Sequence, residues 1–465
     1  MTGLAHDPIT FSVIQAGLTA AADEMLAVLK KTAMSPIIYE VLDVGTGITD
    51  AKGELVSSGA GITTFVGCST RRSGASWKSK ERTRCERSSH KACGCRRCAC
   101  LTPENCCSRC SVSSWPIRAC RISCLPDFVR CDLWAQIAAS RRATTRVTQL
   151  VETYGVETFK SSLENLFEEG ERRARAGLAL LPKGTFRIEE KQDDGARWQA
   201  EIRITDDTFT AERSGNPDQR EAPYNTSRAG AVISSQMIFR ALSDPTLAAN
   251  AGSFRPLKVI TREGTIFHAT GTAPHGYYFE TRIRLHDMLW QCMARALPDR
   301  MPAGHFTSIC GTVLAGDHPD TGRRFTMVEP QMGGWGATAK HDGLDAMYSA
   351  SHGETFNCPF EICESRHGID VGYKRLNENA NGRRQHAGGK GLSVSYKPRG
   401  RTVLAGGYSR NRIPVWGLNG GTNSIAVRSR DGSNENYAFV SGLKVQPGNE
   451  IVISTANGGG WATPT

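Results

Sequence analysis

The sequence has no long hydrophobic run and no recognisable nucleotide-binding loop. No apolar stretch approaches the roughly eighteen residues that a membrane-spanning helix needs, so we expect no membrane span. At the N-terminus no basic segment precedes an apolar one, which argues against a secretory signal peptide and predicts a cytoplasmic protein. Neither GxxxxGK(S/T) nor a GxGxxG between a strand and a helix occurs, so no part of the chain predicts an ATP cradle.

Little net charge and few cysteines lie outside residues 71–131. That segment holds eleven Arg and three Lys against four acidic residues, a net charge of +10 out of +11 for the whole chain. Twelve of the sixteen cysteines fall between Cys68 and Cys131. Because the remainder is nearly neutral, the basic composition does not by itself predict a nucleic-acid or membrane partner.

Residues 71–100 also contain no Ile, Leu, Val, Phe or Met. Such a stretch buries too little apolar surface to offset an ordering cost of about 1–2 kcal/mol per residue. Its thiols, such as Cys93, Cys95 and Cys98, could form a zinc module, or a disulfide framework that a cytosolic redox poise disfavours. We prefer a third interpretation, a shifted reading frame of a GC-rich gene, because it explains the Cys, Arg and Ser enrichment and the missing aliphatic residues together.

The rest of the 465 residues has the composition of a globular protein, 39% hydrophobic and 22% charged, and is long enough for two or three packed units. Asp7 and Pro8 have the N-cap and first-turn types of a helix start, and apolar residues then keep a helical period up to a pair of lysines. Residues 41–49 and 54–57 flank the turn 50–53 and predict a β-hairpin.

The middle of the chain alternates between helical and strand patterns. Asp132 is expected to open a second helix, and residues 156–180 form a third. The period changes to two over residues 184–210, which predicts a short meander, and residues 225–245 and 281–297 are expected to be helical.

From about residue 325, pairs of glycines separate short Val, Ile and Tyr strands. The predicted fold class is therefore α+β, with an N-terminal helix and hairpin, a central mixed region and a β-rich, Gly-punctuated C-terminal third. The predicted divisions of the chain are 1–70, 71–131, 132–324 and 325–465.

Short motifs outside the Cys-rich segment occur in a fixed order. They are residues 7–10 (DPIT), 32–38 (TAMSPII), 132–139 (DLWAQIAA), 250–256 (NAGSFRP), 333–337 (GGWGA), 342–343 (DG), 357–361 (NCPFE), 388–391 (GGKG), 416–421 (WGLNGG) and 458–461 (GGGW). With them the chain resembles the hydantoinase B/oxoprolinase family, the B-type subunits of ATP-dependent N-methylhydantoinases and 5-oxoprolinases, related to acetone and acetophenone carboxylase large subunits. It departs from the family at Glu212-Arg213-Ser214-Gly215, where Asp-Phe-Ser-Gly is usual.

The resemblance implies a divalent metal held by a Thr-His-Leu-Pro-Asp motif and a following His-rich Asp-Ile-Gly-Gly motif, upstream of Asp132. Neither motif occurs in this sequence, and Cys124-Leu125-Pro126-Asp127 repeats only part of the first one. Such a site needs several convergent donors. We therefore expect no metal ligand and no cofactor to be retained in this chain, and ATP to bind the A-type partner subunit that the resemblance implies.

Three polar residues remain as candidate catalytic groups. Asp342, in a Gly-rich turn, and His352 with Glu354 could act as acid, base or substrate-binding groups, although capping and turn roles are the commoner use of such residues. His275 and Glu280 flank three aromatic residues, for which half-buried packing is expected in preference to a substrate shelf.

The resemblance implies a B-type component of an ATP-dependent cyclic-amide hydrolase of the hydantoinase or 5-oxoprolinase type. It would work in a hetero-oligomer with the A-type subunit on a small cyclic amide, and would be impaired because the metal-ligand motifs are missing. A carboxylase large subunit is the first alternative. A zinc- or nucleic-acid-binding protein acting through residues 71–131 and the non-functional product of a damaged gene are the others.

Overall fold

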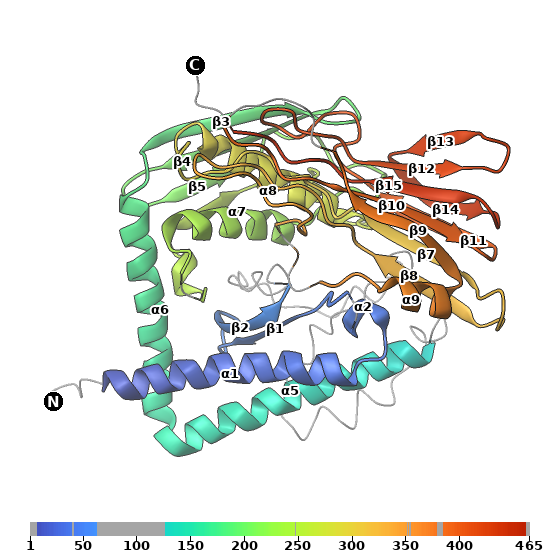
Figure 1. Ribbon diagram of the computed structural model, residues 1–465. Coiled ribbons are helices and arrows are strands. Elements are labelled where there is room, and N and C mark those ends of the chain that lie inside the picture. Colours follow the sequence, from blue (N-terminus) through green and yellow to red (C-terminus); the bar gives the residue numbers. More distant parts are fainter. Residues whose placement is uncertain are drawn as a thin grey trace, which may run out of the picture. The chain divides into compact units, whose positions relative to one another are not determined.

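The computed structural model of the protein describes residues 7–39, 41–62, 126–246, 248–350, 352, 355–378 and 385–461 (Figure 1). The chain forms two compact units: Met1–Arg172 with Thr246–Phe254, and Arg173–Pro245 with Arg255–Thr465. The predicted four-part division of the chain stays a prediction. Residues 63–125, with most of the Cys-rich segment, lie outside the described residues, and so do the zinc, disulfide and shifted-frame interpretations of it.

The first unit consists of helices and a two-stranded hairpin. Its elements are α1 (Pro8–Thr32), α2 (Pro36–Tyr39), β1 (Gly45–Thr49), β2 (Leu55–Gly61), α5 (Pro126–Tyr154), most of α6 (Val156–Ala179) and the 3-10 turn η3 (Gly252–Phe254). The predicted N-cap is confirmed, because the Asp7 carboxylate accepts hydrogen bonds from the backbone N–H of Ile9 (3.1 Å) and Thr10 (3.2 Å). The hairpin is confirmed as well, with Gly53 at φ +80° in its turn.

Asp132 does not open the second helix, because α5 already begins at Pro126. Its side chain is buried, and Oδ1 accepts hydrogen bonds from the backbone N–H of Met34 (2.9 Å) and Ser35 (3.0 Å), just before α2. An acidic residue ahead of an apolar helical run is typical of an N-cap, which is why the sequence suggested a helix start. The carboxylate instead ties α5 to the start of α2.

α1 is long and apolar enough to cross a membrane by length and composition, with a mean hydropathy of 1.3 over an 18-residue window. Its apolar face is used inside the first unit: Ile14 and Leu18 pack with Val56, and Leu26 packs with Val44. The composition of α1 is therefore that of a core helix.

The second unit begins with a four-stranded sheet and two helices. The strand order is β3-β4-β5-β6, antiparallel except for the parallel pair β5-β6. The elements are β3 (Gly184–Lys191), β4 (Arg197–Ile204), β5 (Phe209–Glu212), β6 (Leu257–Ile260), α7 (Arg228–Ser243) and α8 (Tyr278–Ala294), and α8 packs on β3 and β4. The meander and both helices were predicted, whereas β6 was not.

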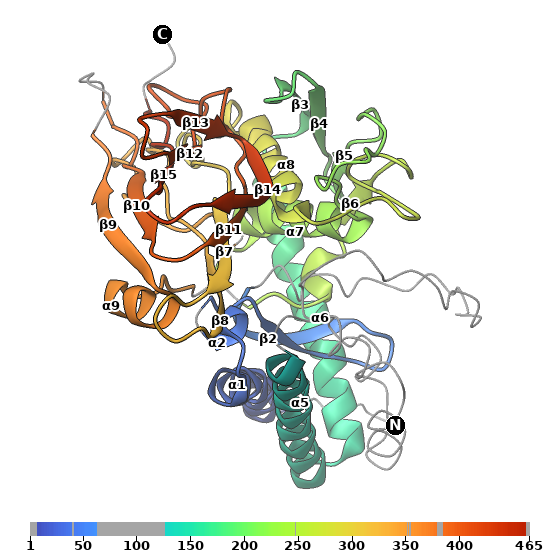
Figure 2. The same ribbon diagram turned by 90° about the vertical axis from the view of Figure 1, so that its right-hand side faces the viewer.

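Two further sheets make up the rest of the second unit (Figure 2). One has the order β14-β11-β7-β8 and the other β13-β12-β15-β10-β9. Their strands are β7 (Gly311–Asp317), β8 (Arg324–Glu329), β9 (Ile369–Leu376), β10 (Leu392–Pro398), β11 (Thr402–Gly407), β12 (Ser424–Arg428), β13 (Asn434–Tyr437), β14 (Phe439–Val445) and β15 (Glu450–Ser454), with α9 (Phe360–Ile362) and the π-helical turn η4 (Cys363–His367) between β8 and β9.

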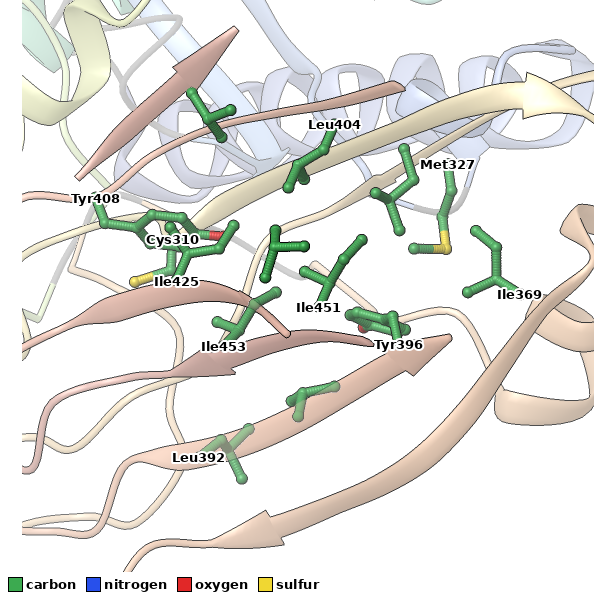
Figure 3. Packing of buried hydrophobic residues seen from close by; sticks show 14 of the residues in the cluster. Cys310, Met327, Ile369, Leu392, Tyr396, Leu404, Tyr408, Ile425, Ile451 and Ile453 are labelled. Carbon is green, nitrogen blue, oxygen red and sulfur yellow. The ribbon is translucent and has the colours of Figure 1, made fainter. Parts of the chain in front are cut away.

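The two sheets share one hydrophobic core (Figure 3). Met327 and Leu404 enter it from the first sheet, and Ile369, Tyr396 and Ile451 from the second. Alternate strand residues point inward, and each fully buried aliphatic side chain contributes about 1.5–3 kcal/mol. The α+β class with a strand-rich C-terminal region is confirmed.

Candidate functional site

Asp342 lies in an exposed turn of the long segment between β8 and α9. Its side chain is 71% exposed, and Oδ1 accepts a hydrogen bond from the Ala387 backbone N–H (2.8 Å) and lies 3.5 Å from His386 Nδ1. These contacts hold the turn against the neighbouring loop. A catalytic role for Asp342 stays a prediction, and Glu354 lies outside the described residues.

His352 lies further along the same segment and has different partners. Its Nδ1 is 2.9 Å from Thr355 Oγ1, and its ring stacks on Tyr348 with 5.7 Å between centroids. The structure therefore gives His352 a hydrogen-bonded, partly buried position in which an acid or base role stays a prediction.

Glu280 is a main-chain anchor at the start of α8. Its buried carboxylate accepts hydrogen bonds from the backbone N–H of Ile309 (2.9 Å) and Ser409 (3.1 Å), and burial raises its pKa. The preceding Tyr277 packs against Phe439, with 5.0 Å between ring centroids. These contacts agree with packing and not with a substrate shelf.

The glycine-rich motifs, which are far apart in the sequence, meet in one cluster of loops. The backbone N–H of Gly389 donates to Trp335 O (2.8 Å), that of Gly458 to Gly389 O (2.9 Å) and that of Leu418 to Gly460 O (3.0 Å). Main chain here packs directly on main chain. A Cβ on Gly334 would lie 2.0 Å from Gly389 O. Only glycine, which has no Cβ, avoids this clash.

α8 buries an unusual set of polar side chains beneath these loops. Glu280, Arg282, Arg284, His286 and Asp287 are each at most 5% exposed. Burying a charge is costly unless it is paired, so each needs partners from the elements packed around α8.

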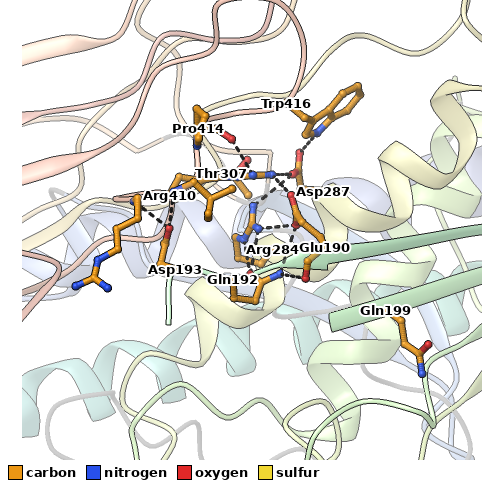
Figure 4. Close-up of polar contacts among 12 residues, drawn as sticks. Glu190, Gln192, Asp193, Gln199, Arg284, Asp287, Thr307, Arg410, Pro414 and Trp416 are labelled. Carbon is orange, nitrogen blue, oxygen red and sulfur yellow. Dashed lines mark hydrogen bonds and ion pairs between the residues drawn. The ribbon is translucent and has the colours of Figure 1, made fainter. Parts of the chain in front are cut away.

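Two arginines and two carboxylates form a closed ion network around Asp287 (Figure 4). Arg410 Nη2 lies 2.7 Å from both Asp287 Oδ2 and Glu190 Oε1. Arg284 Nη2 lies 2.5 Å from Glu190 Oε2, and its Nη1 lies 3.6 Å from Asp287 Oδ2. The formal charges of these four groups cancel.

Asp287 also connects the network to aromatic and imidazole rings. Its Oδ1 accepts a hydrogen bond from Trp416 Nε1 (3.0 Å) and lies 3.6 Å from Nδ1 of the buried His305. Burial alone would raise the pKa of Asp287, but His305 together with Arg410 and Arg284 outweighs burial and lowers it. Asp287 is therefore an anion that orients its neighbours.

Four rings extend from Asp287 toward the glycine loops. Trp290 lies 5.3 Å from His286 and 6.0 Å from His305 between ring centroids, and Trp335 lies 5.4 Å from His305. Burial lowers the pKa of His286 to about 3, so this imidazole is neutral near pH 7.

The divalent ion that the resemblance implies does not fit this arrangement. Within the part of the chain that the structure describes, no three His, Cys, Asp or Glu side chains converge as a metal site would require.

The residues of this site come from five segments that are distant in the sequence, so no local pattern predicts it. One signal was available: the helix predicted at residues 281–297 has charged residues on positions that an amphipathic helix would reserve for its core.

Comparison with known proteins identifies the family. The pattern of the hydantoinase B/oxoprolinase family matches residues 7–78 and 117–464, so the chain belongs to this family, as its motifs predicted. The unmatched interval 79–116 lies within the Cys-rich segment.

Named relatives are similar over most of this chain. The B-type chain of a putative D-/L-hydantoinase from Pseudomonas sp. strain NS671 is 26% identical over 73% of this chain and 60% of its own length. The beta chain of the caprolactamase from Pseudomonas jessenii is 26% identical over 72% and 61%, and 5-oxoprolinase 1 of Arabidopsis thaliana is 24% identical over 71% and 27%. The chain thus spans about three-fifths of the subunit-sized relatives and a quarter of the oxoprolinase.

Two solved structures have the same fold. The ATP-dependent caprolactamase from Pseudomonas jessenii superposes with a TM-score of 0.81 at 16% identity, covering 99% of this chain and 92% of that one. Nucleotide-free acetone carboxylase superposes with a TM-score of 0.77 at 12% identity, covering 98% and 76%.

Proposed function

We propose that this chain is the B-type component of an ATP-dependent cyclic-amide hydrolase of the hydantoinase or 5-oxoprolinase type, acting in the cytoplasm. The observation that carries the proposal is the family match over residues 7–78 and 117–464. The caprolactamase fold, shared over nearly the whole chain, supports it.

The partner is an A-type subunit that binds ATP. Two observations support this. The sequence has no phosphate-binding loop of its own. The relatives of similar size are named as subunits, whereas the 5-oxoprolinase matches this chain over only 27% of its length.

The division of labour follows from the chemistry of the amide bond. Opening an unstrained cyclic amide is uphill near neutral pH, and phosphorylation of the amide oxygen makes the ring carbon a better electrophile. One subunit then activates the amide while the other positions the ring and the attacking water. The α8 network, with its oriented His305 and its indoles, suits the second task.

This chain works slowly in that role. The Thr-His-Leu-Pro-Asp and Asp-Ile-Gly-Gly motifs, which the family resemblance associates with its metal ligands, do not occur in the sequence. Such ligands would hold a metal that helps to activate the attacking water, and loss of even the residues that support metal ligands costs about 10–100-fold in metal affinity or activity.

A carboxylase is the second candidate, favoured by the acetone carboxylase fold. Purifying the chain with an A-type subunit and measuring ATP consumption, ring-opened product and bicarbonate incorporation separates the two. Ring opening of hydantoin or a lactam supports the hydrolase. Bicarbonate incorporation into a ketone without ring opening replaces it with the carboxylase, and failure of the two chains to co-purify contradicts both.

A further inference from the structure

A lysine, an asparagine and a glutamate from three segments of the second unit lie together. Lys374 stands on β9, the outer strand of one sheet, and Glu329 ends β8, the outer strand of the other. Asn357 is the first residue of the NCPFE motif, in the segment that leads into α9. Lys374 Nζ donates to Asn357 Oδ1 (2.5 Å) and lies 4.0 Å from Glu329 Oε1. The amine therefore lies against a side-chain amide and near a carboxylate.

Two further hydrogen bonds hold Asn357 and Glu329 beside each other. Asn357 Nδ2 donates to Pro330 O (2.6 Å), and the backbone N–H of Cys358 donates to Glu329 Oε2 (3.1 Å). The amide thus bonds to the residue that follows Glu329, and the carboxylate bonds to the residue that follows Asn357. Because both Oδ1 and Nδ2 of Asn357 have a partner, the carbon between them keeps one orientation toward Lys374.

These groups are largely shielded from water. The side chains of Lys374 and Glu329 are 14% and 3% exposed. Tyr396, a residue of the shared core, has its hydroxyl 3.5 Å from Glu329 Oε1 (Figure 3). Burial lowers the pKa of Lys374, although Glu329 and Cys358 partly offset this effect. A lowered pKa increases the fraction of neutral amine, which is the nucleophilic form.

We propose that Lys374 and Asn357 form an intramolecular isopeptide bond, with Glu329 as the proton carrier. Glu329 takes a proton from the Lys374 ammonium, and the free amine attacks Asn357 Cγ. Glu329 hands that proton to Nδ2, the Cγ–Nδ2 bond breaks and Oδ1 re-forms the carbonyl. The departing ammonia takes the second proton that Nζ gives up. The products are a secondary amide and ammonium, so the carboxylate is regenerated and no nucleotide, metal or oxidant is used.

The bond closes a loop of the chain around α9 and η4. It joins the segment after β8 covalently to β9, and so fixes the connection between the outer strands of the two sheets. This gives the first residue of the NCPFE motif a covalent role that does not depend on the proposed function.

Mass spectrometry of the purified full chain tests the bond without a partner subunit or a substrate. We expect an intact mass, measured after denaturation, that is lower than the sequence mass by one ammonia. A tryptic digest is expected to contain one branched peptide that joins Asn357 to Lys374. Lys374→Arg and Asn357→Ala remove this peptide, and Glu329→Gln lowers its amount at least about tenfold. Lys397→Arg is the matched control and leaves the bond unchanged, because Lys397 lies 3.8 Å from the Glu450 carboxylate but is half-exposed.

The full sequence mass in the folded, unsubstituted chain overturns the proposal, whether or not the variants fold. Loss of ammonia without the branched peptide also overturns it, since an asparagine elsewhere can lose ammonia by forming a succinimide. An unchanged amount of branched peptide in Glu329→Gln, with a circular dichroism spectrum that matches the unsubstituted chain, overturns the assigned role of Glu329.

Discussion

Arg410 and Asp287 form a fully buried ion pair, with 2.7 Å between guanidinium Nη2 and carboxylate Oδ2 and 1% exposure on each side. The pair joins the segment after β11 to α8. Asp287 also accepts a hydrogen bond from Trp416, which stands in the glycine-loop cluster. The same carboxylate therefore orients His305 and fixes the loops around the candidate site.

Arg410→Met is expected to destabilise the protein by about 3–5 kcal/mol, because removing one partner leaves Asp287 and Glu190 buried with less compensation. Denaturant unfolding measures the loss. The matched surface change is Lys160→Ala, which removes an exposed pair with Glu157 and is expected to cost no more than about 0.5 kcal/mol. Similar costs for the two variants would contradict the assigned role of the network.

Arg213→Met, unlike Arg410→Met, is not expected to lower the stability of the protein. This arginine stands where the family usually has Phe, is 1% exposed, and donates only to Ala231 O (2.8 Å) and Ser235 Oγ (2.7 Å) within the described residues. Burial lowers its pKa to about 10. Replacing it leaves no buried charge behind, so the melting temperature is expected to stay level or rise by a few degrees. A fall as large as that of Arg410→Met would show that the Arg213 guanidinium stabilises the fold.

Gly334→Ala is expected to disrupt the loop cluster, because the new Cβ would lie 2.0 Å from Gly389 O and 2.4 Å from Gly458 N. Main-chain atoms on both sides cannot move aside cheaply, so we expect a cost at the upper end of the range of about 1–3 kcal/mol that overpacking usually has. Gly311→Ala is the control, since its nearest neighbour is a side-chain atom 3.6 Å away. Thermal unfolding of the two variants should differ clearly; equal melting temperatures would contradict direct main-chain packing.

Stability is expected to fall in mild acid. Burial lowers the pKa of His367 to about 4 and that of His286 to about 3, whereas both titrate near 6.5 in the unfolded chain. Above pH 6.5 both histidines are neutral in the folded and the unfolded chain, so the unfolding free energy does not change with pH through them. Between that pH and the folded values the unfolded chain binds the extra protons, so the unfolding free energy drops by up to about 1.4 kcal/mol per pH unit for each histidine.

Denaturation at pH 7.5 and 5.5 measures this slope. His367→Phe is expected to make it shallower by removing one of the two groups, and His341→Asn, at an exposed turn, should leave it unchanged. An equal slope in His367→Phe and the unsubstituted chain would rule out His367 as a source of acid sensitivity.

Local chemistry made much of the fold predictable. The Asp7-Pro8 helix start, the 50–53 turn and the period-two meander each depend on neighbouring residues, and each is found in the structure. The role of Asp132 could not be predicted, because its partners, the N–H groups of Met34 and Ser35, lie 98 and 97 residues away in the sequence and leave no local pattern.

The candidate site could not be predicted for the same reason. Asp342 and His352 were predicted as candidates because glycines and acidic residues lie near them in the sequence. The network instead combines Glu190, α8, His305 and the loop after β11. Buried ion pairs and long-range hydrogen bonds connect these segments, and sequence spacing does not record them.

The most direct test compares ring-opening rates of two complexes with the same A-type subunit. One contains this chain, and the other contains it with residues 79–116 replaced by the corresponding segment of the B-type hydantoinase chain from Pseudomonas sp. strain NS671. We predict ATP-dependent hydantoin or lactam hydrolysis by the second complex and a rate at least about 100-fold lower for the first. Equal rates, or none from either complex, would contradict a B-type chain that has lost its metal-binding segment.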